Sequence, residues 1–241
     1  MKVKKFIVII ASILFLVSLT GAWIVYKKYT RLHGYDINKT LYPVTGIDIS
    51  QHTGIVDFSL IRQENIDFIY MKSTEGGDYV DPLFERNYKE AKNAGFTVGC
   101  YHLFRYNVPG KIQARNYLHA ITDKEFDLPL VADVEEGKPG EKYNREVVIS
   151  ELKIFLEELE NAGYLHPIIY TNKKNYSIFI EEELNNYNLW IAHLDSKPSN
   201  RVNWLFWQHW LNKKIPGAEG YIDMNTFNGS REDWFRYLQK D

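Results

Sequence analysis

The chain has 241 residues, of which 45% are hydrophobic, 25% charged and 15% aromatic, and this composition excludes an intrinsically disordered or low-complexity protein. Its formal net charge is −2, but residues 1–31 carry six basic side chains and no acidic one. Residues 32–241 therefore carry 23 basic and 31 acidic side chains, a net charge of −8. Because contact with phosphate needs a basic surface, this balance excludes a nucleic-acid partner.

The first clear pattern along the chain is residues 6–26, a stretch of 21 residues without a charged side chain. At a rise of about 1.5 Å per residue, such a helix spans about 31 Å, enough for the hydrocarbon core of a bilayer. We predict an uncleaved signal anchor over residues 1–31, with a transmembrane helix at about 6–26 in contact with membrane lipid. The alternative is a cleaved signal peptide with a small-residue site near Ala22. Either interpretation places the rest of the chain outside the cytoplasm, and the anchor predicts a single-pass protein of the cell membrane.

Residues 32–44 are predicted to form a short stalk, and residues 45–241 have the length of one domain. Runs rich in β-branched and aromatic residues predict eight strands in that domain, and helical stretches separate the first six. This alternation predicts an α/β fold, an irregular TIM-like β/α barrel. The predicted strands cover residues 45–49, 67–72, 97–104, 129–134, 167–171, 189–193, 204–209 and 221–226.

Three helices have the clearest signals. Residues 145–162 repeat apolar side chains every three or four positions. Residues 81–95 begin with a capping aspartate and a first-turn proline and end at a glycine. A helix at about 230–239 closes the barrel. The last three strands follow one another too closely for full helices between them, which makes the predicted barrel irregular.

In barrels of this kind, chemistry takes place where the strands end and the loops begin. Polar and aromatic side chains stand at the ends of all eight predicted strands, and aromatic rings can pack on the C–H faces of sugars. We expect substrate contacts from Glu75, Tyr101, His102, Tyr170, Trp190 and Gln208. Trp207 is a further aromatic candidate, while the single Cys100 is predicted to be a buried small hydrophobe and excludes an intramolecular disulfide.

Asp133 and Glu135 are the most informative pair. Residues i and i+2 of a strand share one face, so both carboxyl groups are expected to point into the mouth of the barrel. Asp48 and Asp223 are expected there too, because the first and last strands close the barrel side by side. Repulsion among these acids favours a protonated carboxyl group near neutral pH, and cleavage of a glycosidic bond needs such an acid beside a carboxylate.

Other interpretations of the acids remain open at this point. A surface pair at a strand end or a set of ligands for a hard cation also fits an Asp-x-Glu sequence. His102, His193 and His209 do not follow a known ligand spacing, so no metal site is predicted. No cofactor is predicted either, because the sequence has no phosphate-binding loop and no Gly-x-Ser-x-Gly motif.

Nine short segments follow one another along the chain in a characteristic order. They are Gly46-Ile47-Asp48-Ile49-Ser50, Tyr70-Met71-Lys72-Ser73-Thr74-Glu75-Gly76, Asp81-Pro82, Gly99-Cys100-Tyr101-His102, Leu130-Val131-Ala132-Asp133-Val134-Glu135, Ile169-Tyr170-Thr171, Leu189-Trp190-Ile191-Ala192, Phe206-Trp207-Gln208 and Ile222-Asp223-Met224-Asn225. In this order they resemble the glycoside hydrolase family 25 lysozymes, the Chalaropsis-type N-acetylmuramidases. The resemblance covers the chain from Gly46 onward.

The resemblance implies an enzyme that cleaves the β-1,4 bond between N-acetylmuramic acid and N-acetylglucosamine in peptidoglycan glycan strands. By match, Glu135 is the general acid, and Asp133 orients the N-acetyl group of the substrate or acts as a base. Asp48 and Asp223 complete the acidic cluster. Two alternatives stay open: a chitinase-like hydrolase of N-acetylglucosamine polymers, and a catalytically silent scaffold that binds the cell wall.

Overall fold

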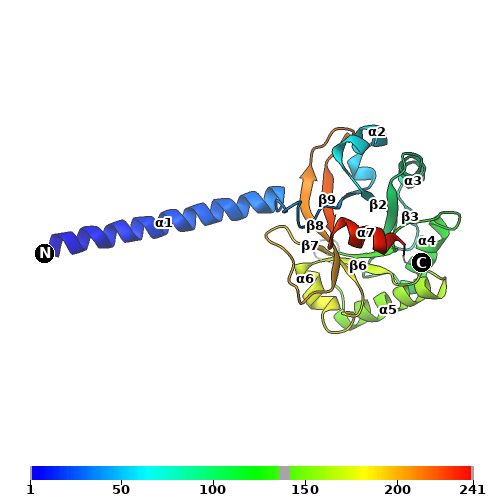
Figure 1. The fold of residues 1–241 in the computed structure, drawn as a ribbon. Coiled ribbons are helices and arrows are strands. Elements are labelled where there is room, and N and C mark those ends of the chain that lie inside the picture. The colour runs from blue at the N-terminus through cyan, green and yellow to red at the C-terminus, as the bar shows by residue number, and fades with distance from the viewer. Residues whose placement is uncertain (1, 136–141, 240–241) are drawn as a thin grey trace.

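The computed structural model describes residues 2–135 and 142–239, and their side chains except those of residues 2–11, 27 and 29–33. Its centre is a closed barrel of eight strands, to which the short β3 (Tyr79–Val80) adds a hairpin on β2 (Figure 1). The prediction of an irregular β/α barrel is confirmed. The barrel strands are β1 (Thr45–Ile49), β2 (Phe68–Glu75), β4 (Thr97–Leu103), β5 (Val131–Val134), β6 (Ile168–Asn172), β7 (Leu189–Ala192), β8 (Trp204–Lys213) and β9 (Ile222–Phe227).

The strand order explains how the barrel closes. Seven barrel strands pair in parallel, in the order β1, β2, β4, β5, β6, β7, β8. The last strand, β9, is antiparallel to both of its neighbours, β8 and β1. In that register Asp48 lies directly opposite Asp223, as expected from the closing strands.

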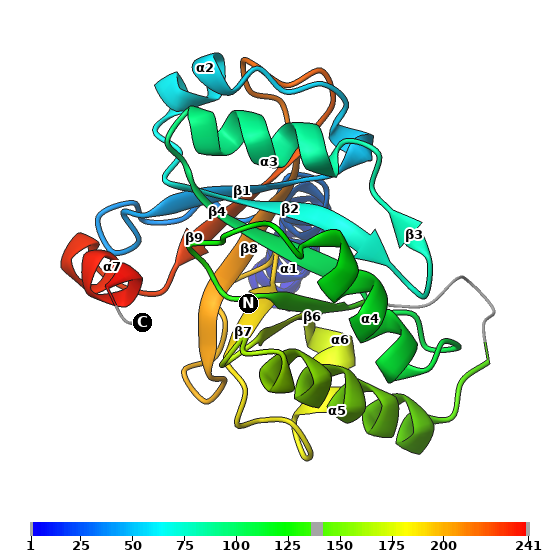
Figure 2. The ribbon, with the colours of Figure 1, turned by 90° about the vertical axis from the view of Figure 1, so that its right-hand side faces the viewer.

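Three longer helices cover the outside of the barrel, and the short α7 (Arg231–Leu238) lies across one end of it (Figure 2). The longer ones are α3 (Phe84–Asn93), α4 (Gly110–Ala120) and α5 (Arg145–Asn161). The helix predicted at 81–95 starts later, because Asp81 accepts a hydrogen bond from the Leu83 N–H and the intervening residues form a turn. The remaining connections are short: α2 (Phe58–Ile61), α6 (Lys173–Asn175), η1 (Gln51–Thr53), η2 (Arg62–Glu64) and η3 (Tyr176–Ile180).

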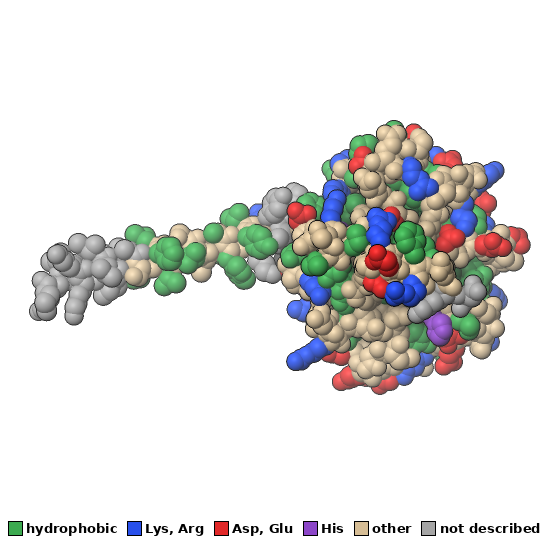
Figure 3. Space-filling model, viewed as in Figure 1, with side chains coloured by type: hydrophobic (Ala, Val, Ile, Leu, Met, Phe, Trp, Pro, Cys, Tyr) green, Lys and Arg blue, Asp and Glu red, His purple; other side chains and the backbone are tan. Residues whose placement is uncertain are grey.

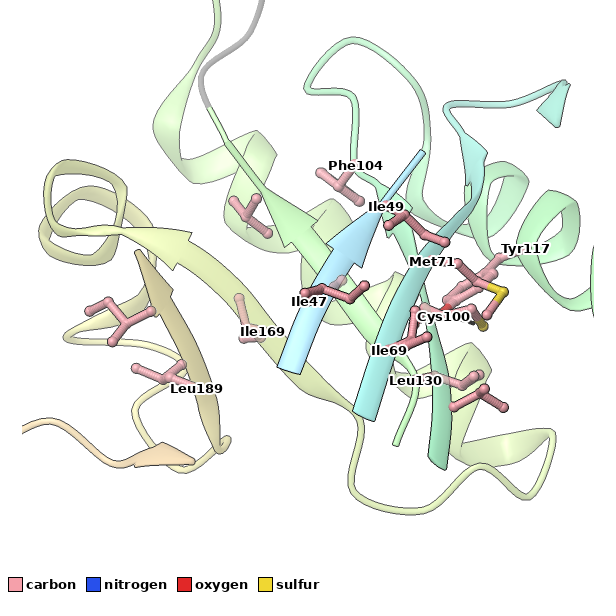
Figure 4. Close-up of a cluster of buried hydrophobic side chains, with 14 of the residues drawn as sticks. Ile47, Ile49, Ile69, Met71, Cys100, Phe104, Tyr117, Leu130, Ile169 and Leu189 are labelled. Carbon is pink, nitrogen blue, oxygen red and sulfur yellow. Dashed lines mark hydrogen bonds between the residues drawn. The ribbon is translucent and has the colours of Figure 1, made fainter. Parts of the chain in front are cut away.

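Alternation along the strands divides the core into two layers. The outward residues pack against the helices, and Figure 4 shows part of this layer, with Ile47, Met71, Cys100 and Leu130 among the labelled side chains. Cys100 is fully buried, as predicted. Inward side chains of the strands, together with residues just before two strands and Trp234 of α7, fill the end of the barrel next to α7. The cluster consists of Val44, Phe68, Tyr70, Leu128, Val131, Ile168, Tyr170, Trp190, Phe206, Phe227 and Trp234.

The segment predicted to be a stalk lies along the barrel wall. The Tyr35 N–H donates to the carbonyl oxygen of His209 over 2.6 Å, and the Tyr35 ring lies 5.4 Å from that of Trp207. Ile37 and Val44 are buried against the domain. Residues 34–44 are therefore part of the folded domain rather than a free linker.

The helix α1 (Lys2–His33) projects away from the domain (Figure 1). Its large apolar side chains between Ile13 and Tyr26 are exposed, as the green surface in Figure 3 shows. Within the part of the chain whose side chains are described, no helix is both long enough and apolar enough to cross a membrane. The structure therefore does not support the transmembrane prediction, of which residues 6–11 lie outside that part.

Candidate active site

A cavity of about 590 Å³ opens at the carboxyl ends of the parallel strands. It lies where the strand ends were expected to place the chemistry, and eight of the ten predicted site residues line it. These are Asp48, Tyr101, Asp133, Glu135, Tyr170, Trp190, Gln208 and Asp223. Side chains from β1, β4, β5, β6, β7, β8 and β9 thus converge on one opening.

Asp48 and Asp223 form one half of the acidic cluster and share a hydrogen-bond donor. The Gln208 Nε2 donates to Asp48 Oδ2 over 3.0 Å and lies 3.3 Å from Asp223 Oδ2. The Asn225 Nδ2 donates to the same Asp48 oxygen over 2.7 Å. Burial raises the pKa of Asp48 well above its usual value, the charge of Asp223 raises it further, and these amide donors oppose the rise. Burial likewise raises the pKa of Asp223.

Asp133 and Glu135 form the other half. Asp133 is 4% exposed, and among the described residues its Oδ1 has no hydrogen-bond partner. Burial, and then the charge of Glu135, raise the pKa of Asp133 well above its usual range. Burial also raises the pKa of Glu135, although this side chain remains accessible at the mouth. The pair therefore keeps a proton at a higher pH than two exposed carboxyl groups could.

The backbone at Glu135 is held by two buried side chains. The Tyr106 hydroxyl donates to the Glu135 carbonyl oxygen, and Asn175 donates to that hydroxyl over 3.3 Å. Asn175 also donates to the carbonyl oxygen of Val134 over 3.3 Å. These contacts fix the end of β5 and with it the direction in which the Glu135 side chain leaves the strand.

Two aromatic residues of the cavity floor orient the amides that serve the acids. An indole N–H can only donate, so the 2.8 Å contact from Trp190 Nε1 turns Asn225 Oδ1 away from the carboxyl groups and leaves Nδ2 for Asp48. The Tyr170 hydroxyl donates to Gln208 Oε1 over 2.7 Å, which turns Gln208 Nε2 toward the acids. Trp190 is 2% exposed and Tyr170 7%, so both act mainly through these amides.

The structure does not bring Glu75 and His102 to the cavity. Tyr101 and His102 are consecutive in β4, so only one of them can face inward, and it is Tyr101. His102 is fully buried beneath α4 and α5, with its ring nitrogens 2.8 Å from Thr74 Oγ1 and 3.1 Å from Gln113 Oε1. Burial lowers the pKa of His102 to about 4, so it is a neutral core residue at physiological pH and the prediction of a substrate contact is corrected.

Glu75 belongs to an ion network beside the site. Its Oε2 accepts from Lys72 Nζ over 2.6 Å, and its Oε1 accepts from Arg105 Nε over 2.8 Å. Lys72 is 7% exposed, and its charge opposes the rise in the pKa of both Asp133 and Glu135. Glu75 therefore holds a cation near the acids instead of lining the cavity.

Trp207, predicted as a further aromatic candidate for sugar contact, does not line the cavity either. It faces the outer layer, where its Nε1 donates to the carbonyl oxygen of His193 over 2.7 Å and its ring packs on Tyr35 and Tyr42. In the described part of the chain, no group of three or more histidine, cysteine or acidic side chains is arranged to hold a metal ion.

Several cavity residues were not anticipated from the sequence. His52, Asn172, Asn212 and Tyr221 line the cavity, and Asn225 supports it from below. Asn225 lies two residues after Asp223, so strand alternation could have found it. The others lie in loops or at strand ends, where the sequence has no such periodicity.

Comparison with known proteins assigns the chain to a family. A family model described as glycosyl hydrolases family 25 matches residues 47–218, which span the strands carrying seven of the eight predicted residues that line the cavity. The chain belongs to this family. It is therefore a glycosidase, and the resemblance stated from the short segments is confirmed.

Individual relatives agree with this assignment. The structure matches that of a family 25 glycosyl hydrolase from Bacillus anthracis with a TM-score of 0.78 and 30% identity, over 86% of this chain and 98% of that one. The chain is 32% identical to the uncharacterized protein YegX of Escherichia coli O6:H1, covering 86% of this chain and 80% of that protein. It is 30% identical to the autolytic lysozyme of Clostridium acetobutylicum, covering 76% of this chain and 55% of that lysozyme.

Proposed function

We propose that this glycosidase is a muramidase that cleaves the β-1,4 bond between N-acetylmuramic acid and N-acetylglucosamine in peptidoglycan. The observation that carries the proposal is the pair Asp133 and Glu135, whose carboxyl groups lie in an open cavity of the family 25 barrel and have raised pKa values. The name of the Clostridium acetobutylicum relative, an autolytic lysozyme, supports the same substrate.

Glu135 acts as the general acid in this proposal. Its carboxyl group is accessible from the cavity, while burial raises its pKa, so it can meet the substrate in the protonated form. Proton transfer to the glycosidic oxygen lets the bond to the anomeric carbon break and leaves positive charge on the sugar. Those carboxyl groups among Asp48, Asp133 and Asp223 that are ionised stabilise that charge.

Asp133 orients the substrate. Its Oδ1 is buried without a described partner, and such an atom is costly unless a ligand satisfies it. The N–H of an N-acetyl group on the sugar is a suitable donor. With that N–H held, the acetamido oxygen can approach the anomeric carbon as the leaving group departs, or Asp133 can act as a base toward water.

The product analysis separates this proposal from its alternatives. The full chain in detergent is incubated with purified peptidoglycan, and the new reducing ends are reduced with borohydride and identified by mass spectrometry. We expect N-acetylmuramitol from the wild-type protein and none from Glu135→Gln. N-acetylglucosaminitol, or cleavage of chitin oligomers alone, would establish the chitinase-like alternative. A folded wild-type protein that binds the wall without releasing either sugar would establish the scaffold.

We also propose that the catalytic domain acts outside the cytoplasmic membrane, where its substrate lies. The uncharged sequence of residues 6–26 and the exposed apolar side chains on α1 support an association of this helix with membrane lipid. Fractionation of cells, with protease added to cells stripped of wall, tests the location. We expect the chain in the membrane fraction and its domain digested from outside. A domain that resists external protease until the membrane is opened contradicts this location.

A further inference from the structure

The exposed aromatic side chain of Tyr221 lies at the edge of the cavity and takes no part in the proposed proton transfer. Tyr221 lines the cavity with 57% of its surface exposed, in contrast to the buried Trp190 and Tyr170 of the floor. An aromatic residue left open to solvent at a concave site is typical of a binding surface, since its ring is available to a ligand.

The position of Tyr221 relates it to the acids. Tyr221, Asp223 and Asn225 alternate along one side of the chain at β9, from the opening of the cavity to its base. Asn225 is fully buried and Tyr221 is open. Tyr221 immediately precedes β9 and lines the same cavity as Asp223. Its exposed ring therefore lies at the opening of the cavity that contains the acidic cluster.

The backbone that carries Tyr221 is fixed to the loop after β1. The Gly220 N–H donates to the carbonyl oxygen of Thr53 over 2.7 Å, and the Glu219 N–H donates to that of Ile55 over 3.1 Å. A Cβ atom on Gly220 would lie 2.6 Å from the Thr53 carbonyl oxygen, so only glycine permits this close approach. The loop and the β8–β9 hairpin together form one rigid side of the cavity.

The ring itself is held by a cation. Lys214 Nζ lies over the Tyr221 ring, 4.7 Å from its centre, and donates to the Glu219 carbonyl oxygen over 2.7 Å. The ammonium covers one face of the ring, and the other face is left for a ligand.

We propose that Tyr221 forms a sugar-binding subsite next to the acidic cluster, in which its ring packs on the C–H face of a pyranose of a β-1,4-linked N-acetylhexosamine strand. This inference rests on the proposed function and adds a subsite beyond the sugars at the bond that is cleaved. The exposed His52, on the loop that Gly220 contacts, offers its ring nitrogens to hydroxyl groups of the same sugar.

The test measures binding by calorimetry in the full chain carrying Glu135→Gln, so that ligands remain intact. The ligands are peptide-free glycans of alternating N-acetylglucosamine and N-acetylmuramic acid with two, four and six sugars. Adding Tyr221→Ala is expected to weaken binding of the hexasaccharide about tenfold, with a smaller effect on the disaccharide. Tyr221→Phe keeps the ring and is expected to bind like the parent. Phe235→Ala is the matched control, since this exposed ring lies on α7 at the opposite end of the barrel.

Two results would overturn the subsite. One is equal affinity of the Tyr221→Ala protein and its parent for the hexasaccharide. The other is an equal loss for the disaccharide and the hexasaccharide, which would show that Tyr221 acts through the acid cavity. If the parent binds chitin oligomers and no muramic acid glycans, the proposed substrate is wrong, and the same length series made with chitin oligomers decides the subsite separately. Thermal melting of each variant checks that the domain is folded.

Discussion

The two ends of the barrel interior are built from the same strands and differ in almost every chemical respect. On β5 the inward residues change from Val131 to Asp133, and on β8 they change from Phe206 to Gln208, within one alternation of each strand. The end next to α7 is a packed aromatic cluster, while the other end is an open cavity with four acids. Stability and chemistry are thus separated along the barrel axis by about two residues of each strand. This separation predicts that each end can be damaged without the other.

The largest effect is expected at the open end. Glu135→Gln removes the proton donor and keeps the size of the side chain, so activity on peptidoglycan should fall about 10²- to 10⁴-fold. The thermal melting temperature should stay within a few degrees of wild type, because Glu135 is exposed and outside both apolar layers. Turnover and calorimetry on the same preparation measure the two effects. Near-normal turnover by a folded Glu135→Gln protein excludes Glu135 as the acid.

At the packed end the reverse is expected. Trp234 of α7 is 3% exposed and packs on Phe68, with ring centres 5.4 Å apart, and on Phe227, at 5.1 Å. Trp234→Ala should reduce the free energy of unfolding by about 3–5 kcal/mol, measured by urea denaturation. The pH dependence of activity, recorded well below the melting temperature, should not move. The neighbouring Phe235→Ala is the control, since an exposed side chain costs less than about 0.5 kcal/mol. A shifted pH profile in Trp234→Ala would mean that the two ends are coupled.

The acids at the open end should also lower stability as the pH rises. Burial raises the pKa of Asp48 and Asp133, so the folded state binds more protons than the unfolded chain. The stability that these groups contribute is complete below the unfolded pKa of about 4 and is lost as the pH rises through the raised values. We expect the free energy of unfolding to decrease from about pH 5 to neutral pH.

Asp133→Asn sharpens this test, because it removes one titrating group and the repulsion that it causes. In this variant the free energy of unfolding should decrease less steeply as the pH rises, and at pH 7 it should be higher than in wild type. The variant should also lose activity. Urea denaturation across a pH series provides the measurement. A slope identical to that of wild type would show that Asp133 does not titrate in this range.

The smallest effect is expected from metal removal. No metal cluster is arranged in the part of the chain that the structure describes, and the proposed steps use only carboxyl groups and the substrate's own acetamido group. Excess chelator should therefore leave turnover unchanged. Loss of activity on chelation, with recovery on adding a divalent cation, would indicate that Asp48 and Asp223 bind a metal ion.

Much of this arrangement is predictable from the sequence, because alternation within a strand is a local property. Alternation along β5 predicts that Asp133 and Glu135 share one opening of the barrel. The proximity of the closing strands predicts that Asp48 lies near Asp223, and in the structure the two residues are opposite each other. The same rule, applied to consecutive residues, would have removed His102 in favour of Tyr101. Contacts between strands are harder to predict from the sequence, since they depend on the register in which the strands pair.

Register explains what the sequence did not indicate. The pairing of β2 with β4 shifts between Lys72 and Thr74, and Glu75 beyond this shift joins Lys72 and Arg105. Irregular pairing between β8 and β9 likewise precedes the hairpin that brings Tyr221 to the cavity. Irregularities of this kind leave no periodic signal in the residues themselves.

The antiparallel closing strand has a consequence for the order of events during synthesis. β1 is the first barrel strand to be translated, and one of its two partners, β9, is the last. Contacts between segments so distant in the chain form late, because the loop-closure entropy must be paid before the contact gains any stability. The ribosome must release residues 222–227 before the ring can shut, and only then does Asp48 meet Asn225 and Gln208 in their final places. Because Asp223 and Asn225 of the acidic site lie on β9, we expect a nascent chain to be inactive until this strand has joined the barrel. Closure of the fold and onset of activity would then be one late step.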